Sequence, residues 1–317
     1  MGTGSSDSET KALVDPLVMQ QIGQLELMSR VVVDGFLAGK HRSTHKGGCC
    51  EFAQHRPYAP GDEFSRIDWN VYARSDRYFI RQFEEETNLQ AFLALDTSGS
   101  MRFGMSTKTK YEFAQIAAAC LSRFLLHQRD AVGLAVLTEP APISVPPRRH
   151  ASHLRALLYT LLAHKAVGAG ELATQVKGFV PRMKRRGLLI VFSDCFGNVD
   201  ELCNAFRLVR ARGHDLIVFQ VLAPEEANFD FRRWSAFHSL ENQRDRVRLD
   251  PAAVRDAYLR NLQRHVETLQ ESITGIGGDY VRITTDQELG AVLAHFLRSR
   301  KARQARAGSH AGRVVVS

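Results

Sequence analysis

The sequence predicts an α/β protein with a doubly wound, mostly parallel sheet and a small N-terminal appendage. Apolar segments of strand length alternate with amphipathic helices from about residue 89 onward. Strands separated by helices of this length run parallel, because each crossover helix returns the chain to the same end of the sheet. With 317 residues, 44% of them hydrophobic, the chain can bury one large core and carry a smaller unit beside it.

The predicted elements follow the spacing of the apolar residues. Strands are predicted at residues 78–83, 91–95, 132–137, 143–145, 188–192, 216–221 and 280–283. Helices are predicted at residues 16–37, 110–128, 150–163, 172–180, 201–212, 255–273 and 289–298, and residues 224–249 have room for one hairpin. We therefore divide the chain into a disordered N-terminus (1–12), a helix with a mixed-charge appendage (13–88), an α/β domain (89–299) and a basic disordered tail (300–317).

Charge and cysteine content argue against several classes of protein. The net charge of +8 includes five basic residues and no acid in residues 300–317, so the rest of the chain is only weakly basic and nucleic acid is not the expected partner. Five cysteines without CxxC spacing predict neither a disulfide framework nor a zinc site. The sequence has no signal-peptide pattern and no apolar run of the roughly 18–20 residues that span a bilayer. We expect a cytoplasmic protein without stable membrane insertion.

Oxygen-bearing side chains follow two of the predicted strands. Asp96, Ser98 and Ser100 come after strand 91–95, and Asp194 comes after strand 188–192. If 91–95 is the first strand, 188–192 is its neighbour across the switch point, where doubly wound sheets bind ligands. Such oxygens suit Mg²⁺, Mn²⁺ or Ca²⁺, and two adjacent carboxylates call for a cation or a proton between them. The alternative is that these side chains only form a turn and cap a helix.

Two motifs resemble known families. Asp96-x-Ser98-x-Ser100 after an apolar strand resembles the metal-ion-dependent adhesion site of von Willebrand factor A domains. The preceding segment resembles the family named domain of unknown function 58, through Gly39-x-His41-x-Ser43, Glu51-Phe52, Arg56-x-Tyr58-x-Pro60-Gly61-Asp62, Asp68-Trp69, Ala73-Arg74 and Phe83-Glu84-Glu85-Glu86. The resemblance covers about residues 15 to 300. It implies a von Willebrand A-like domain that is not an enzyme and is often paired with a MoxR-type AAA+ ATPase.

The resemblance also assigns metal ligands. Asp96, Ser98, Ser100 and Asp194 match the adhesion-site positions, whereas Gly170 stands where the family usually has a threonine. Water, Thr174 or Glu171 could fill that place, so Glu171 joins the predicted ligands. We expect a weaker or altered site for Mg²⁺, with Mn²⁺ and Ca²⁺ as alternative ions.

The segment from residue 56 to residue 74 is dense in charged and aromatic residues. Arg, Tyr and Trp dominate binding hot spots, so one interpretation is a partner-docking surface. The other is an ion-paired small unit that packs on the sheet. The candidate docking residues are Arg56, Tyr58, Asp62, Asp68, Trp69 and Arg74.

Known catalytic motifs are missing from the sequence. It has no Gly-x-Ser-x-Gly elbow and no phosphate-binding P-loop, and Ser98 stands where an aspartyl-phosphate phosphatase needs an acid. We hypothesise a binding module in which a divalent ion coordinates an acidic residue of a partner, by resemblance a MoxR-type ATPase or a client protein in assembly or maturation. The alternatives are a metal-dependent phosphoester hydrolase and a nucleic-acid binder that uses the basic tail. A small-molecule substrate is not expected.

Overall fold

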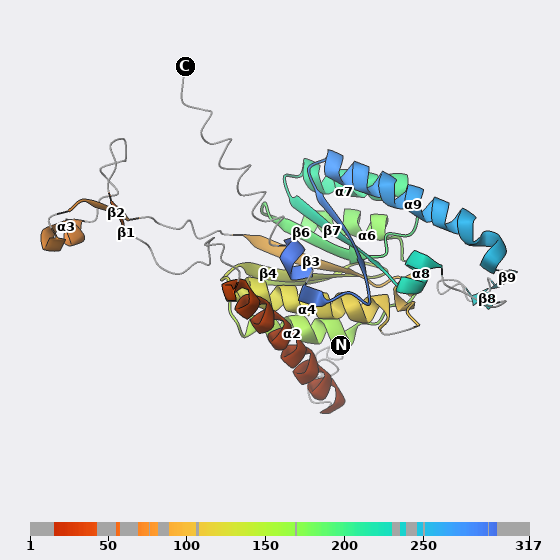
Figure 1. The fold of residues 1–317 in the computed structure, drawn as a ribbon, viewed down its shortest axis with the longest axis horizontal. Coiled ribbons are helices and arrows are strands. Elements are labelled where there is room, and N and C mark those ends of the chain that lie inside the picture. Colours follow the sequence, from red (N-terminus) through yellow and green to blue (C-terminus); the bar gives the residue numbers. More distant parts are fainter. Residues whose placement is uncertain are drawn as a thin grey trace, which may run out of the picture. The chain divides into compact units, whose positions relative to one another are not determined.

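A computed structural model describes residues 16–42, 55–57, 69–75, 77–81, 89–105, 108–168, 170–229, 235–238, 246–249, 251–290 and 292–296 (Figure 1). The chain divides into two compact units, one formed by residues 1–40 and 89–317 and the other by residues 41–88. The predicted disordered ends, 1–12 and 300–317, lie outside the described residues.

The larger unit is built on a six-stranded sheet of order β10-β7-β6-β3-β4-β5. Its strands are β3 (Gln90–Asp96), β4 (Ala131–Leu137), β5 (Ile143–Arg148), β6 (Leu188–Ser193), β7 (Asp215–Leu222) and β10 (Asp279–Thr284). Only β5 runs antiparallel to its neighbour. The predicted α/β class and mostly parallel, doubly wound sheet are therefore confirmed. Because β3 pairs with β4 on one side and β6 on the other, the predicted switch point is also confirmed.

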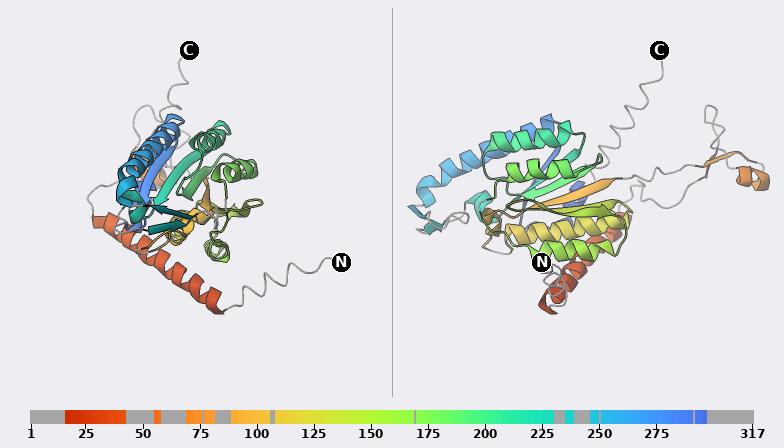
Figure 2. Two further views of the ribbon diagram at one scale, coloured as in Figure 1. Left: turned by 90° about the vertical axis from the view of Figure 1, so that its right-hand side faces the viewer. Right: turned by 180° about the vertical axis from the view of Figure 1, so that it is seen from behind.

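Helices cover both faces of this sheet (Figure 2). One face packs against α2 (Pro16–Arg42), α4 (Lys110–His127), α5 (His153–Ala163) and the helical residues 292–296, and the other against α6 (Leu172–Phe179), α7 (Val199–Ala211) and α9 (Pro251–Gly275). The alternation of side chains along each strand divides the core in two: Leu93 and Leu95 face the first layer, and Phe92 and Ala94 face the second. Burial on both faces explains why these strands read as continuous apolar runs.

Helix α2 belongs to the larger unit. Ile22, Leu25 and Val33 are buried in the core of the first face, and the Phe36 ring meets the Phe124 ring edge-on at 6.4 Å between centroids. Its contacts join α2 to the sheet, whereas the sequence grouped it with the appendage. None of the helices in the described part of the chain combines the length and apolar character that crossing a membrane requires.

The smaller unit contains β1 (His55–Pro57), α3 (Trp69–Ser75) and β2 (Phe79–Arg81). β1 and β2 pair antiparallel, and β2 lies within the strand predicted at 78–83. The sequence did not predict α3. Its Tyr72 ring stacks on Tyr78 at 4.5 Å between centroids and meets Trp69 edge-on at 6.1 Å, so aromatic contacts supply packing where aliphatic residues are few.

Strand β5 forms one edge of the six-stranded sheet and is mostly exposed. It contains two consecutive prolines, Pro146 and Pro147. Proline has no backbone N–H to donate to a neighbouring strand, so it is tolerated at such an edge. The predicted short edge strand at 143–145 is longer here by three residues.

The segment after β7 contains a short helix and a hairpin. Helix α8 (Pro224–Asn228) was not predicted, whereas β8 (Ser235–His238) and β9 (Arg246–Leu249) pair antiparallel as the expected hairpin. Helix α8 matters for the site, because its Glu226 reaches back toward the end of β6.

Candidate functional site at the carboxyl ends of β3 and β6

Asp96 is the last residue of the central strand β3, and its side chain is only 3% exposed. Its Oδ1 accepts a hydrogen bond from the Ser98 N–H at 2.8 Å, and its Oδ2 accepts one from the Ser193 hydroxyl at 2.6 Å. Ser193 ends the neighbouring strand β6. One carboxylate therefore links the ends of the two strands at the switch point.

The two serines of the Asp-x-Ser-x-Ser motif lie side by side. Ser98 Oγ and Ser100 Oγ are 3.1 Å apart, at the start of a 3₁₀ turn over Gly99–Arg102. The Thr97 hydroxyl fixes the same loop by donating to the Leu137 carbonyl at 2.8 Å. The structure thus brings Asp96, Ser98 and Ser100 together. We call these three residues with Asp194 the β3–β6 cluster.

The Asp96 carboxyl has a raised pKa. Burial raises the pKa of this group most, the negative charge of Asp194 adds to the effect, and hydrogen bonds from Ser193 and Ser98 oppose it, giving a pKa of about 6. Burial and the neighbouring Asp194 charge therefore disfavour the ionised form of Asp96, and a bound proton or cation would neutralise its charge.

Asp194 is ion-paired, which the sequence did not suggest. Its Oδ2 accepts a hydrogen bond from the Lys110 ammonium at 2.8 Å, and its Oδ1 accepts one from the Phe196 N–H at 3.1 Å. The same ammonium donates to Glu226 Oε1 of α8 at 2.7 Å. The Lys110 side chain is completely buried. A buried ammonium thus joins Asp194, a member of the β3–β6 cluster, to Glu226 of α8.

The loop after β6 is held in a strained backbone conformation. Cys195 has a φ of 55°, in the left-handed region that residues with a side chain seldom adopt. Gln220 donates to the Asp194 carbonyl at 2.9 Å, and the His265 ring of α9 lies at 2.9 Å from the Cys195 carbonyl. Contacts from β7 and α9 therefore hold the turn that orients Asp194. Strained backbone conformations of this kind are common at functional sites.

The glycine-rich loop lies beside the β3–β6 cluster, as the resemblance implies. The Val167 N–H donates to the Thr97 carbonyl, and the Gly99 N–H donates to the Gly168 carbonyl, both at 2.8 Å. A Cβ placed on Gly170 would lie 3.9 Å from the Cα of Ser98. Position 170 is therefore close enough for a side chain to reach the serine pair, and this chain has no side chain there.

Glu171 and Thr174, the proposed substitutes for the missing threonine, bond to each other. The Thr174 hydroxyl donates to Glu171 Oε2 at 3.1 Å on an exposed part of the first turn of α6. No hydrogen bond in the described structure joins Glu171 to the cluster. Its role as a ligand stays a prediction that these contacts do not favour.

The predicted docking residues are only partly described. Trp69 and Arg74 lie on α3 with exposed side chains, and Arg56 pairs with Ile80 in the two-stranded sheet. Tyr58, Asp62 and Asp68 lie outside the described residues. The docking surface stays a prediction.

Sequence reasoning missed three residues of the site. Lys110, Glu226 and Ser193 were not among the residues that the sequence assigned to the site. One signal was present for Lys110, because Ala114, Ala117 and Leu121 follow it at spacings of four, three and four on the buried stripe of α4. A lysine on an apolar helix face needs a buried partner.

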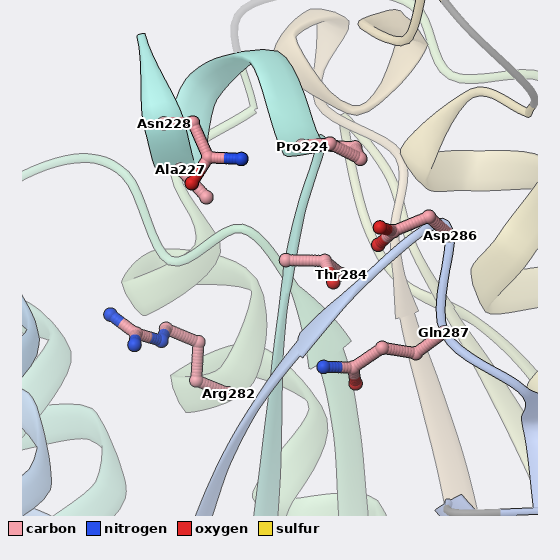
Figure 3. A pocket seen from close by; sticks show the side chains of 7 residues that line it. All are labelled: Pro224, Ala227, Asn228, Arg282, Thr284, Asp286 and Gln287. Atoms are coloured by element: carbon pink, nitrogen blue, oxygen red, sulfur yellow. The ribbon is translucent and has the colours of Figure 1, made fainter.

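A separate polar pocket of about 300 Å³ lies between α8 and the end of β10 (Figure 3). It is lined by Pro224, Ala227, Asn228, Arg282, Thr284, Asp286 and Gln287. Helix α8 is shared by the pocket and the ion pair, because Glu226 on the same helix contacts Lys110.

Comparison with known proteins identifies a family and several relatives. The model of the family described as "Protein of unknown function DUF58" matches residues 54–268. The uncharacterized proteins Mb1516 of Mycobacterium bovis and Rv1480 of Mycobacterium tuberculosis are each 28% identical to this chain over 291 residues, covering 90% of it and 91% of their own length.

Among solved structures, similar chains cover about two thirds of this one. An aerotolerance-related membrane protein from Bacteroides fragilis has a TM-score of 0.45 at 16% identity, with 67% of this chain and 98% of that chain covered. The conserved hypothetical protein BatB from Bacteroides thetaiotaomicron has a TM-score of 0.42 at 18% identity, covering 67% and 99%. The VWA domain of SpRpn10 has a TM-score of 0.38 at 10% identity, covering 66% and 94%.

Proposed function

The chain belongs to the DUF58 family of proteins of unknown function, and we propose that it is a protein-binding module that uses a divalent cation at the β3–β6 cluster. The cation, Mg²⁺ or else Mn²⁺ or Ca²⁺, would take an acidic side chain of the partner. The observation that carries this proposal is the pair of hydroxyls, Ser98 and Ser100, beside the buried Asp96 carboxylate of raised pKa.

The charges of the site fit a divalent cation. The site holds three carboxylates (Asp96, Asp194 and Glu226) and one ammonium (Lys110), so the formal charges sum to −2. The described residues contain no group of three or more His, Cys, Asp or Glu side chains placed to hold a metal ion. A cation would therefore depend on the serine hydroxyls, which are suitable ligands for Mg²⁺ and Ca²⁺.

Each residue has a distinct part in this proposal. Ser98 and Ser100 offer neutral oxygens, Asp96 and Asp194 supply negative charge, and Ser193 and the Ser98 N–H keep Asp96 in place. A bound ion would supply an electrophilic position for a carboxylate from outside. Neutral ligands leave the ion more of its charge than a cage of carboxylates would, which favours binding of an external acid.

A binding role is supported over a catalytic one by the hydrogen bonds of the two aspartates. Both oxygens of Asp96 and both oxygens of Asp194 accept hydrogen bonds from protein groups. A general base must reach the proton that it removes, and these carboxylates are already engaged. By family resemblance we propose a MoxR-type AAA+ ATPase, or a client protein, as the partner.

The replacement of Asp96 by asparagine tests this function. We expect the Asp96→Asn variant to lose Mg²⁺ binding in calorimetry and to lose chelator-sensitive capture of the co-expressed MoxR-type ATPase. The exposed Asp200→Asn variant is the matched control and should keep both. Capture that is unchanged by the substitution and by a chelator would rule out the metal-bridged mechanism.

A threonine at position 170 should strengthen the site. A Cβ at position 170 would make only an ordinary van der Waals contact with Ser98, so the Gly170→Thr variant can add one hydroxyl oxygen there. We expect about tenfold tighter Mg²⁺ binding, the size of effect that one charge-assisted contact supplies. The Gly170→Val variant has the same shape without the hydroxyl, and it should not gain affinity. Equal affinities for the two variants would contradict a missing ligand.

A further inference from the structure

Lys110 is the first residue of α4, and its buried ammonium has unusual surroundings. Besides its bonds to Asp194 and Glu226, the ammonium lies 5.1 Å from the ring centroid of Phe196 and 5.8 Å from that of Phe103. Aromatic faces attract a cation and exclude water from it. Moving this ammonium out of water costs free energy, and a fold does not need a buried ion pair to be stable.

The charged groups lie in a definite order. Asp194 is the charge that acts on Asp96, whereas Asp194 and Glu226 are the charges that act on Lys110. Asp194 belongs to the β3–β6 cluster and bonds to the Lys110 ammonium, which in turn bonds to Glu226. Because electrostatic interactions act through space, the charges of Lys110 and Glu226 act on the β3–β6 cluster from close by.

We propose that Lys110 sets the charge of the metal site, so that a bound divalent ion can still accept a carboxylate from a partner. With Lys110 present, a divalent ion brings the four charged side chains to a net charge of zero. Without Lys110 the sum would be −1, and an incoming carboxylate would be repelled. Lys110 is a positioning and charge-setting residue that never touches the partner. This inference rests on the proposed function.

The proposal predicts opposite effects on the binding of metal and of carboxylate. Removing Lys110 should tighten the binding of the cation and weaken the binding of the carboxylate. Removing the charge of Glu226 should do the reverse. A purely structural role for the ion pair would weaken both, because a distorted site loses both ligands.

The experiment compares three variants with the wild type. Mn²⁺ affinity is measured from free Mn²⁺ by electron paramagnetic resonance, and affinity for a blocked aspartate, N-acetyl-aspartate amide, is measured at saturating Mg²⁺ by NMR. The Glu226→Gln variant keeps an acceptor for Lys110, so it is the main test. We expect about tenfold weaker Mn²⁺ binding and tighter aspartate binding. Where the Lys110→Met variant folds, both changes should reverse.

The exposed Glu201→Gln variant removes the same charge from the first turn of α7, where it makes no ion pair with Lys110, and should match the wild type. The inference is overturned if Glu226→Gln behaves like Glu201→Gln, or if its two affinities move in the same direction. It is also overturned if the wild type binds Mn²⁺ but no aspartate. A wild type that binds no Mn²⁺ would refute the proposed function itself, and the inference with it.

Discussion

Replacing Lys110 by methionine should destabilise the folded protein by about 3–5 kcal/mol at pH 7, the usual cost of removing one partner of a buried ion pair. Asp194 and Glu226 would keep their buried charges without the ammonium that lies 2.8 and 2.7 Å from them. Burial by itself would lower the pKa of Lys110, but the attraction of Asp194 and Glu226 outweighs it and raises the pKa. The ammonium therefore stays charged, and the loss extends over the neutral range of pH.

Urea unfolding monitored by circular dichroism measures this cost. The Lys108→Met variant, two residues away and exposed, is the matched control and should change stability by less than about 0.5 kcal/mol. The double variant with Glu226→Gln should recover part of the loss, because it removes one of the two unpaired charges. A cost below about 1 kcal/mol for Lys110→Met would show that the ammonium is not desolvated as the structure has it.

The Asp96→Asn variant should be more stable than the wild type above about pH 6 when a chelator is present. The pKa of Asp96 rises from 3.8 to about 6 on folding, so between these values the folded protein binds more protons than the unfolded chain. Wild-type stability therefore falls as pH rises through this window, and the loss is complete above it. Asparagine has no charge to bury, so the variant should gain about 3 kcal/mol at pH 8 and little near pH 4.

Urea unfolding at pH 4 and pH 8, in the presence of a chelator, checks this prediction. The Asp200→Asn variant removes an exposed carboxylate and should show no such pH-dependent difference. Millimolar Mg²⁺ should stabilise the wild type at pH 8 and leave Asp96→Asn unchanged, because a ligand stabilises only the state that binds it. An Asp96→Asn variant that is less stable than the wild type at pH 8 would contradict the raised pKa.

The architecture could be predicted because the strands are buried on both faces. Residues Leu188–Phe192 form a continuous apolar run, and such runs between helices indicate parallel strands. The pairing of β3 with β6 then followed from the rule for the switch point, and it placed Asp96 and Asp194 at the same edge. Helix α3 was missed because seven residues are too few to show helical periodicity.

The ion pair could not be predicted from local patterns. Lys110 finds its partners 84 and 116 residues later in the chain. Glu226 lies on a helix of five residues that no periodicity reveals. Glu171 was proposed as a ligand from its place in the chain, but the first turn of α6 brings it to Thr174. The contacts that set the charge of the site are thus decided by tertiary structure.

The prolines of β5 restrict how this protein can associate with others. Pro146 and Pro147 have no backbone N–H to donate, so this stretch of the edge strand disfavours pairing with a strand from another chain. Stacking of copies through this edge is therefore disfavoured, and so is the addition of an extended peptide as a seventh strand beside β5. A partner that binds by strand addition would pair more readily with β10, the edge strand on the opposite side.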